Sequence, residues 1–329
     1  MNKKIAIALV VLVVFLLAGG IGYMAAIQQK PKVVSTKPST QTAEEETQEE
    51  GLTMAYDGDT YEYNRSIKTI LFLGVDKQEE VTIQESAGHG GQSDTMILFL
   101  MNTEDETTTM LEISRNSMIG VDIYDMSGKY FATENAQICL QYAYGDGEKK
   151  SCWLTKKKVG ELFEDKINID GYLSLNVEGI AVLNDAIGGV TLTVPEDYTE
   201  YNPKFQKGAT LTLTGEEAEQ YVRKRDINRV GENEKRMERQ DQYLQALFNQ
   251  MYGKVNSDTV ENLMNVAEPY MVTDLSLQEM QMMANYNLQE KDYEVPGQIQ
   301  QGAGHDEYLV NYEELEKLTR NLFYNKAEK

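Results

Sequence analysis

The sequence predicts an α/β protein placed behind one apolar N-terminal segment. Three apolar runs with the length of buried strands, followed by helix-like periodicity, carry the fold-class prediction. The apolar segment, Ile5–Ile27, has 23 residues without a charge and follows Lys3 and Lys4. It is long enough to span a bilayer, and the lysines favour a cytoplasmic N-terminus with the remaining chain outside the cell. A cleaved signal peptide is the alternative interpretation.

The composition narrows the function classes. The 329-residue chain has a formal net charge of −22, which argues against nucleic acid as a partner because phosphate backbones would be repelled. Its two histidines lie far apart, and two cysteines alone make no zinc motif. Outside the membrane, Cys139 and Cys152 could form one disulfide, or both could remain buried thiols.

The chain divides into four parts. Residues 1–27 form a cytoplasmic tip and transmembrane anchor. Residues 28–65 hold two prolines, a Ser/Thr-rich run and eight acids between Glu44 and Glu62, so they predict a disordered acidic linker. Residues 66–255 form the main domain, and residues 256–329 are expected to be a helical extension packed on it.

The main domain begins with three strands, each flanked by a charged residue. The three apolar runs are Ile67–Val75, Thr95–Met101 and Thr107–Ser114. Asp76 follows the first run, Asp94 precedes the second and Arg115 follows the third. Functional side chains concentrate at such loop positions, so these three residues are site candidates. The polar, glycine-containing segment 77–92 is expected to be a mobile loop.

Later elements alternate between strand and helix patterns. The expected strands are Gly120–Tyr124, Gly171–Val177 and Val190–Val194, and the expected helices are Lys156–Phe163, Glu178–Ile187 and Tyr312–Tyr324. Another helix starts at Thr214, because Glu217 three residues later completes a capping-box pattern. The order of strands in the sheet is not determined by these patterns.

A basic stretch stands out in this acidic chain. Between Arg223 and Arg239 there are seven basic residues against four acidic ones. Arginine grips phosphate through a bidentate fork, so the stretch is a candidate anion site. Its candidate ligands are Arg223, Arg225, Arg236, Arg239 and Gln240. Surface salt bridges to the interspersed acids are the alternative.

Two carboxylates and several arginines together have the chemistry of metal-assisted phosphoryl transfer. Carboxylates hold Mg²⁺, which also bridges phosphate oxygens of a substrate. Arginines neutralise the charge that develops on a leaving phosphate. Sequence spacing alone does not show that these residues converge.

Seven segments in the main domain carry recognisable motifs. They are LFLGVD at 71–76, SDTM at 93–96, ISRNS at 113–117, QYAYGDG at 141–147, AIGGV at 186–190, LTGEEAEQYVRKR at 213–225 and RMERQ at 236–240. In this order they resemble the motifs of the LytR-CpsA-Psr (LCP) family of bacterial envelope proteins. The resemblance covers about residues 67–250, and the single N-terminal anchor agrees with it.

The resemblance implies a three-layer α/β/α sandwich with an apolar tunnel for a polyprenyl chain. It implies transfer of a glycopolymer, such as teichoic acid or capsule, from a polyprenyl-pyrophosphate carrier to peptidoglycan. By position, Asp76 and Asp94 would bind Mg²⁺. The residues that would hold the pyrophosphate are Arg115, Arg223, Arg225 and Gln240, with Arg236 and Arg239 beside them. Asp94, Arg115 and Arg223 would act in catalysis.

The sequence departs from the family motifs at five site positions. They are Gln92, Asn116, Gln137, Cys139 and Asn233. These changes remove two acids and two cations from the expected site. The sequence therefore leaves two functions open: a membrane-anchored, extracytoplasmic phosphotransferase, or a non-catalytic envelope or regulatory protein that binds polyprenyl phosphate.

Overall fold

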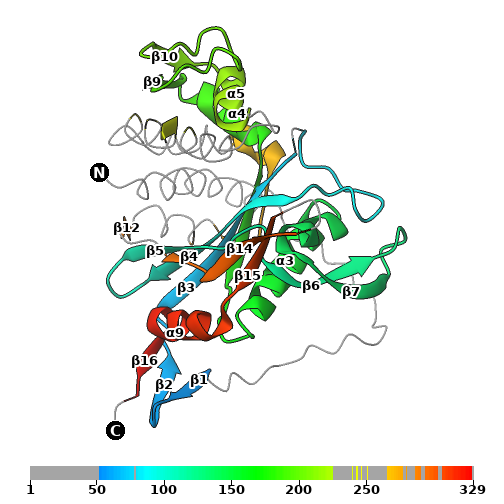
Figure 1. Ribbon diagram of the computed structural model, residues 1–329, viewed down its shortest axis with the longest axis vertical. Helices are drawn as coiled ribbons and strands as arrows, with labels where there is room; N and C mark the ends of the chain where they lie inside the picture. Colours follow the sequence, from blue (N-terminus) through cyan, green and yellow to red (C-terminus); the bar gives the residue numbers. More distant parts are fainter. Residues whose placement is uncertain are drawn as a thin grey trace, which may run out of the picture.

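A mixed seven-stranded sheet forms the centre of the computed structural model (Figure 1). The model describes residues 52–77, 79–224, 265–276, 286–289, 293–302 and 306–327, and the single positions 239, 242, 243, 246, 250 and 279. The strands of the sheet are β3 (Ile67–Val75), β4 (Ser93–Asn102), β5 (Thr107–Glu112), β8 (Gly171–Asn176), β11 (Met271–Thr273), β12 (Asn287–Leu288) and β13 (Tyr293–Glu294). Their order is β11-β8-β3-β4-β5-β12, and β13 also pairs with β5.

The central strands are long apolar runs because both faces of the sheet are buried. Side chains alternate along β3, so Ile70 and Phe72 join one hydrophobic cluster while Leu71 and Leu73 join the other. Helix α3 (Lys149–Leu162) contributes to the second cluster. The first cluster includes residues of α4 (Glu178–Ala186) and α5 (Gly215–Arg223).

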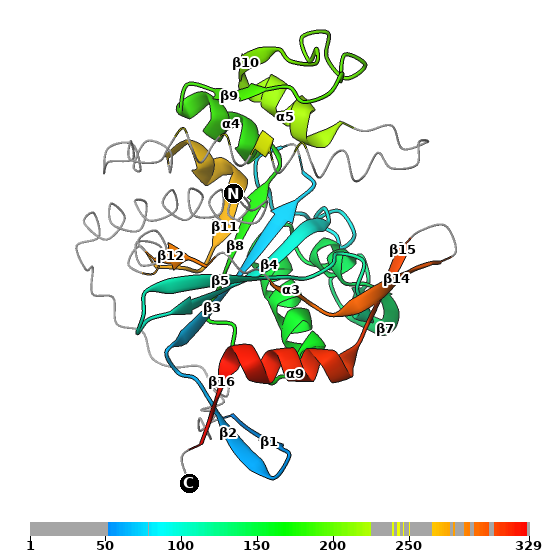
Figure 2. The same ribbon diagram turned by 60° about the vertical axis from the view of Figure 1, so that its left-hand side comes forward.

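The strand directions bring Asp76, Asp94 and Arg115 to one edge of the sheet, here meaning the edge where β3, β5 and β8 end and β4 begins. Strand β4 is antiparallel to both β3 and β5. The start of β4 therefore lies beside the ends of β3 and β5. Strand β8 is parallel to β3, so its end reaches the same edge, where the Val177 amide donates to the Val75 carbonyl at 3.0 Å. Helices α4 and α5 lie beyond this edge in both ribbon views (Figures 1 and 2).

Smaller elements surround the sheet. Strands β9 (Val190–Thr193) and β10 (Thr210–Leu213) pair with each other, as do β14 (Gly297–Gln301) and β15 (Asp306–Val310). Helix α9 (Tyr312–Phe323) leads into β16 (Tyr324–Lys326), and the 3₁₀ helix η2 (Glu268–Tyr270) precedes β11.

Most of the elements expected in the main domain are confirmed. Strand β3 has the expected bounds, and the capping box at Thr214 is present, with Glu217 closing it. Helix α3 begins seven residues before the expected Lys156, because the buried positions of its first half include the polar Ser151 and Thr155 and so show no continuous apolar stripe.

The structure corrects the linker at its C-terminal end. Strands β1 (Thr53–Tyr56) and β2 (Asp59–Tyr63) form a hairpin within residues 28–65, where disorder was expected. Asp57 and Gly58 both have positive φ, 50° and 79°, as a tight Asp-Gly hairpin turn requires. The hairpin is ordered because Tyr63 packs on the ring of Phe323, 6.3 Å away between centroids. The preceding residues lie outside the described part of the chain.

The C-terminal region is also richer in strands than a helical extension would be. Within its described residues, β11, β12 and β13 join the central sheet and β16 pairs with β2. Strands β11, β12 and β16 have only two or three residues, too few to show an alternating pattern, which is why the sequence did not reveal them.

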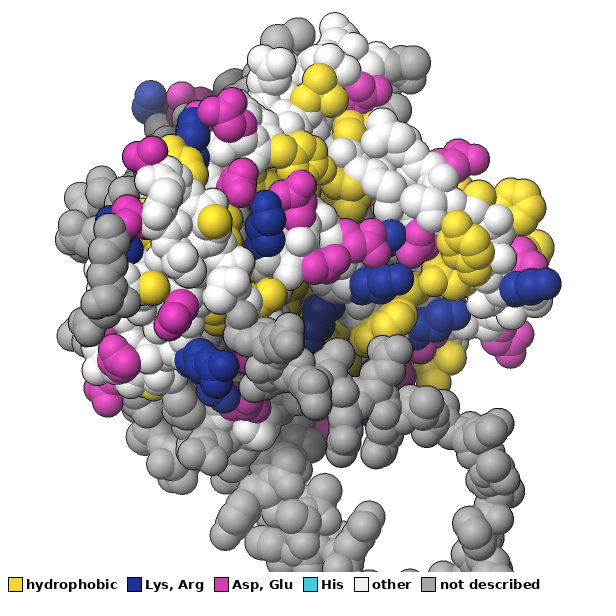
Figure 3. Space-filling model, turned by 90° about the horizontal axis from the view of Figure 1, so that it is seen from below, with side chains coloured by type: hydrophobic (Ala, Val, Ile, Leu, Met, Phe, Trp, Pro, Cys, Tyr) yellow, Lys and Arg dark blue, Asp and Glu magenta, His cyan; other side chains and the backbone are white. Residues whose placement is uncertain are grey.

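A hairpin and a 3₁₀ helix connect the edge of the sheet to α3. Strand β6 (Met118–Tyr124) pairs with β7 (Tyr130–Gln137), and η1 (Ile138–Tyr144) follows. Only the first strand of this hairpin was expected. On the face seen in Figure 3, hydrophobic, basic and acidic side chains are interleaved toward the right, the side on which β6 and β7 lie in Figure 1.

Within the described residues, no helix is both long and apolar enough to cross a membrane. The candidate anchor Ile5–Ile27 lies outside them.

Candidate functional site

The candidate site is built at the edge of the sheet around Arg115. The Arg115 guanidinium pairs with the Asp94 carboxylate through Nη1. Its Nη2 donates to Oε1 of Gln92 at 2.8 Å and to the sulfur of Cys139 at 3.5 Å. Both members of the ion pair keep about a third of their side-chain surface exposed, 31% for Arg115 and 33% for Asp94.

One donor of Arg115 is buried without a described partner. Its Nε has no hydrogen-bond partner among the described residues, although the atom is buried. Burial by itself would lower the pKa of Arg115, but Cys139 and the carboxylates of Asp94 and Asp76 outweigh it and raise that pKa. The side chain is therefore a fixed positive charge held between acids, which suits binding of an anion.

Gln92 joins the two acidic positions through its backbone. The amides of Asp76 and Asp94 both donate to the Gln92 carbonyl at 3.1 Å, and the Gln92 amide donates to Oδ1 of Asp76 at 2.6 Å. Gly91 makes this turn possible, because its φ is +87° and a Cβ there would lie 3.1 Å from Asp76 Oδ1. The two carboxylate-bearing residues are thus held against one peptide.

The two acids fit the protein part of a magnesium site. Mg²⁺ is commonly held by one or two carboxylates and completes its octahedral shell with water and substrate phosphate oxygens. Asp76 and Asp94 supply two carboxylates within one hydrogen-bonded turn. Among the described residues, no cluster of three or more acidic, His or Cys side chains could hold a metal by itself.

Arg223 lies on the same edge, at the end of α5. Its Nη1 donates to Oε1 of Glu219, one turn earlier, at 2.6 Å, and its side chain is 40% exposed. Glu178, which starts α4 just after β8, has its pKa raised by burial and by Glu219 and lowered in part by Arg223. Arg223 is therefore close to the start of α4. No described contact connects it directly to Arg115.

Arg239 has a different environment from the other arginines. Its side chain is fully buried, its Nε donates to the Tyr221 carbonyl at 2.8 Å and its Nη2 donates to the Lys224 carbonyl. The guanidinium also lies over the rings of Tyr198 and Tyr201, 4.9 and 4.7 Å from their centroids. These carbonyls belong to the end of α5, so Arg239 caps the helix that carries Arg223.

Three other candidates, Arg225, Arg236 and Gln240, lie outside the described residues, as does Asn233.

Four of the residues that depart from the family motifs contact one another in two groups. Gln137 Nε2 donates to Oδ1 of Asn116 at 2.7 Å. Gln92 and Cys139 both contact the Arg115 guanidinium. Sequence reasoning noted Gln92 only as a substitution and missed its place at the centre of the site. The Gly90-Gly91 pair that precedes Gln92 was the available sequence signal of a tight turn at this position.

The two cysteines are free thiols in separate places. Cys139 faces Arg115, and burial raises the pKa of its thiol. Cys152 is buried in α3, where burial raises the pKa of its thiol to about 12. The possible disulfide is therefore absent.

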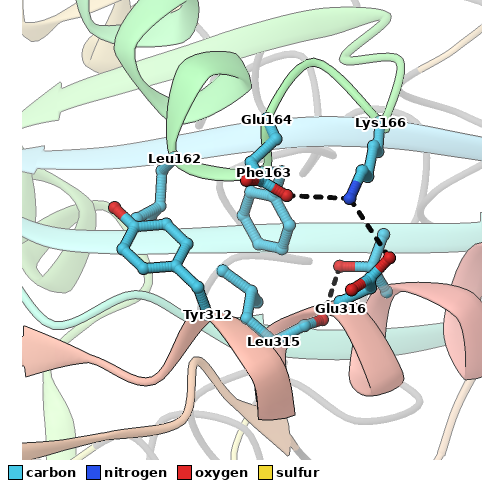
Figure 4. Close-up of a pocket in the computed structure, with 8 residues that line it drawn as sticks. Leu162, Phe163, Glu164, Lys166, Tyr312, Leu315 and Glu316 are labelled. Carbon is cyan, nitrogen blue, oxygen red and sulfur yellow. Dashed lines mark hydrogen bonds and ion pairs between the residues drawn. The ribbon is translucent and has the colours of Figure 1, made fainter.

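A small pocket between the end of α3 and α9 is a separate feature (Figure 4). Its lining includes Lys166, which donates to Glu164 at 2.8 Å and to Glu316 at 3.3 Å. None of the site candidates lines it. Its charged groups pair with each other and tie α9 to the segment after α3.

The chain belongs to the LytR_cpsA_psr family, because the family profile matches residues 25–324. The fold agrees. A crystal structure of Bacillus subtilis TagV aligns over 79% of this chain and 96% of its own, with TM-score 0.53 and 21% identity. A structure titled "TagT bound to LI-WTA" aligns over 78% and 90%, with TM-score 0.52 and 23% identity.

The chain is also similar in sequence to several relatives with named functions. A Halalkalibacterium halodurans protein named polyisoprenyl-teichoic acid–peptidoglycan teichoic acid transferase TagU is 28% identical over 230 residues, 69% of this chain and 67% of its own. A relative with the same name from Oceanobacillus iheyensis is 27% identical over 261 residues, 77% and 74% of the two chains. Biofilm regulatory protein A of Streptococcus mutans is 32% identical over 167 residues, 48% and 37% of the two chains.

Proposed function

We propose that this protein transfers a glycopolymer from a polyprenyl-pyrophosphate carrier to peptidoglycan. Several relatives are named as teichoic acid transferases of this kind. The observation that carries the proposal is the cluster at the sheet edge, where Arg115 pairs with Asp94 and keeps a buried donor unused. A pyrophosphate placed there would meet a fixed guanidinium beside two carboxylates.

The proposed reaction is a substitution at phosphorus. A hydroxyl oxygen of peptidoglycan attacks the phosphate attached to the glycopolymer, and the bond from that phosphorus to the bridging oxygen breaks. Polyprenyl monophosphate leaves with the bridging oxygen, and the hydroxyl proton passes to a base or to solvent. The product contains a phosphodiester.

The proposed site residues have different roles in this reaction. Arg115 and Arg223 neutralise the charge of the pyrophosphate and the leaving phosphate, with Arg225, Arg236 and Gln240 proposed to assist. Arg239 belongs to this set by sequence, and its packing supports a role in positioning α5. Asp76 and Asp94 would hold Mg²⁺, which when bound polarises phosphate oxygens as a Lewis acid.

The proposal also includes the membrane anchor and the layered fold with its lipid tunnel. Ile5–Ile27 would anchor the chain in the cell membrane with its bulk outside, and the fold would be the three-layer sandwich with a polyprenyl tunnel. Burial of both faces of the sheet supports the layered arrangement.

The test uses the full chain in lipid nanodiscs with a polyprenyl-pyrophosphate-linked glycopolymer and peptidoglycan. We expect Mg²⁺-dependent release of polyprenyl monophosphate and covalent labelling of peptidoglycan. Asp94→Ala should lose the response to Mg²⁺ while still binding the lipid. Binding of the lipid by the parent protein without any release would reject the transferase.

Binding of the lipid without release would instead favour a non-catalytic envelope protein that binds polyprenyl phosphate. The neutral pair Gln137–Asn116 and the neutral Gln92 beside Arg115 are the observations in its favour, since they reduce the charge of the site.

A further inference from the structure

A surface of basic and aromatic residues extends from the β6–β7 hairpin onto α3. On the hairpin, Met126 is 77% exposed, Phe131 74% and Tyr130 54%. On α3, Trp153 is 56% exposed. Large apolar side chains gathered at this exposure mark contact sites more often than ordinary protein surface.

The outward side of α3 carries four lysines, one of which, Lys157, also pairs with Glu161 at 3.7 Å. Lys149, Lys150, Trp153, Lys156 and Lys157 follow the spacing of one helix face, and none of them is among the buried residues of α3. The fifth lysine of the helix, Lys158, points inward instead, and its ammonium group pairs with the Asp122 carboxylate at 2.9 Å. Four outward lysines on one helix contrast with the formal net charge of −22 for the chain.

The hairpin and the helix form one continuous surface. The Lys150 ammonium lies 5.0 Å from the centroid of the Tyr124 ring, and Tyr130 packs edge-on against Tyr124 at 6.1 Å. A Cβ on Gly128, in the hairpin turn, would lie 3.4 Å from Lys150 Nζ. We call this surface the lysine–aromatic face. Its members are Met126, Lys129, Tyr130, Phe131, Lys149, Lys150, Trp153, Lys156 and Lys157.

The acid in the hairpin turn, Asp125, is engaged by the backbone of the turn. Oδ1 of Asp125 accepts hydrogen bonds from the Ser127 amide at 2.9 Å and the Lys129 amide at 3.0 Å. The carboxylate therefore closes its own turn. Lys129, Tyr130 and Phe131 then follow as an uninterrupted basic and aromatic run.

We propose that the lysine–aromatic face contacts a bilayer surface that contains anionic phospholipid. Aromatic rings and lysines together are typical of segments that lie at the membrane interface, where the rings enter the headgroup layer and the ammonium groups pair with lipid phosphates. Charge complementarity selects this partner, because the rest of the acidic molecule would be repelled by the same lipid surface. Met126 and Phe131 have no polar atoms suited to hydrogen-bonding a sugar, and they favour lipid over a soluble glycan.

The contact is independent of the proposed transferase and additional to any N-terminal anchor. Trp153 provides a reporter, since it is the only tryptophan in the chain. The full chain is placed in nanodiscs of phosphatidylcholine, with or without phosphatidylglycerol, and tryptophan is excited where tyrosine does not absorb. We expect a shift of emission to shorter wavelength and quenching by brominated acyl chains in the phosphatidylglycerol discs, both reversed at high salt.

Two variants test the parts of the face separately. Lys149→Gln with Lys156→Gln should remove most of the phosphatidylglycerol-dependent shift by lowering the attraction to the lipid. Phe131→Ser should reduce quenching by brominated chains more than it reduces the salt dependence. Ile299→Ser is the matched control, because Ile299 is similarly exposed, at 71%, on β14.

Three results would overturn the proposal. Trp153 emission could stay unchanged in phosphatidylglycerol discs, or it could shift equally in discs of phosphatidylcholine alone. Soluble poly(glycerol phosphate) could also produce the shift when phosphatidylglycerol does not, which would make this face a site for an anionic polymer.

Discussion

Two ion-pair clusters differ in how far they are exposed to solvent: one includes Asp122 of strand β6, and the other includes Arg115, which precedes that strand. Lys158 and Asp122 pair with only 4% and 10% of their side chains exposed, and Thr133 and Glu161 complete their hydrogen bonds. Arg115 and Asp94 are about one-third exposed, and Arg115 keeps a buried Nε without a described partner. The first cluster is buried within the fold, whereas the second is partly open to solvent at the proposed site.

The largest effect should come from breaking the buried cluster. Lys158→Met leaves the Asp122 carboxylate buried without its cation, so we expect the free energy of unfolding to fall by roughly 3–5 kcal/mol. Urea denaturation measures it. Lys317→Met is the control, because its pairs with Glu313 and Glu314 on α9 are screened by solvent and their loss should change stability little. Equal losses in both variants would contradict the distinction.

Breaking the exposed cluster should affect activity instead. Arg115→Ala should lower release of polyprenyl monophosphate by about 100-fold, because a donor aimed at developing charge is lost. The unfolding transition should move far less than in Lys158→Met. Arg65→Ala, an exposed arginine just before β3, should leave the release rate unchanged. A folded Arg115→Ala protein with parental activity would remove Arg115 from the site.

Arg223 should behave as a weaker member of the ligand-binding group. Its pair with Glu219 is an exposed pair within one helix, so Arg223→Ala should change stability by only about 0.5 kcal/mol. Binding of polyprenyl phosphate should weaken about tenfold if one charge-assisted contact of roughly 1.5 kcal/mol is lost. Isothermal titration tests this, and unchanged affinity would reduce Arg223 to a surface ion pair.

The smallest effect is a dependence of stability on pH. Burial alone would raise the pKa of Asp122, but hydrogen bonds from Thr133 and Lys158 outweigh it and hold that pKa below its usual range. The stabilisation is therefore present above the unfolded pKa, about 3.9, and is lost as pH falls through the folded value. Denaturation curves from pH 7 to pH 3 should show Asp122→Asn losing less stability over the acid limb than the parent. Parallel curves would exclude Asp122 as the titrating group.

The sequence predicts the charged residues at the sheet edge better than it predicts the contacts that hold them together. Asp76, Asp94 and Arg115 were identified because they flank long apolar strands, and the order of those strands brings them to one edge. Hydrogen bonds through Gln92 depend on a turn conformation that no periodicity encodes. Lys158 was not distinguishable from the four outward lysines of α3, because the same residue type serves both environments.

Short strands and tight turns explain the remaining differences. The β1–β2 hairpin lies in an acid-rich segment, and its Asp57-Gly58 turn signal was outweighed there by composition. Its stability comes from distant partners, Phe323 and Tyr324, whose rings pack on Tyr63. Contacts across such a sequence separation leave no local pattern.

The sheet β1-β2-β16 has a further topological consequence. Thr53 on β1 and Asn325 on β16 both pair with Glu62, from opposite sides of β2. With strands about 4.8 Å apart, the first and last strands lie only about 10 Å from each other. A short peptide could therefore join them, and a circular permutant opened in the loop between β9 and β10 would keep every strand pairing. The fold depends on which strands meet, and it does not depend on which of them comes first along the chain.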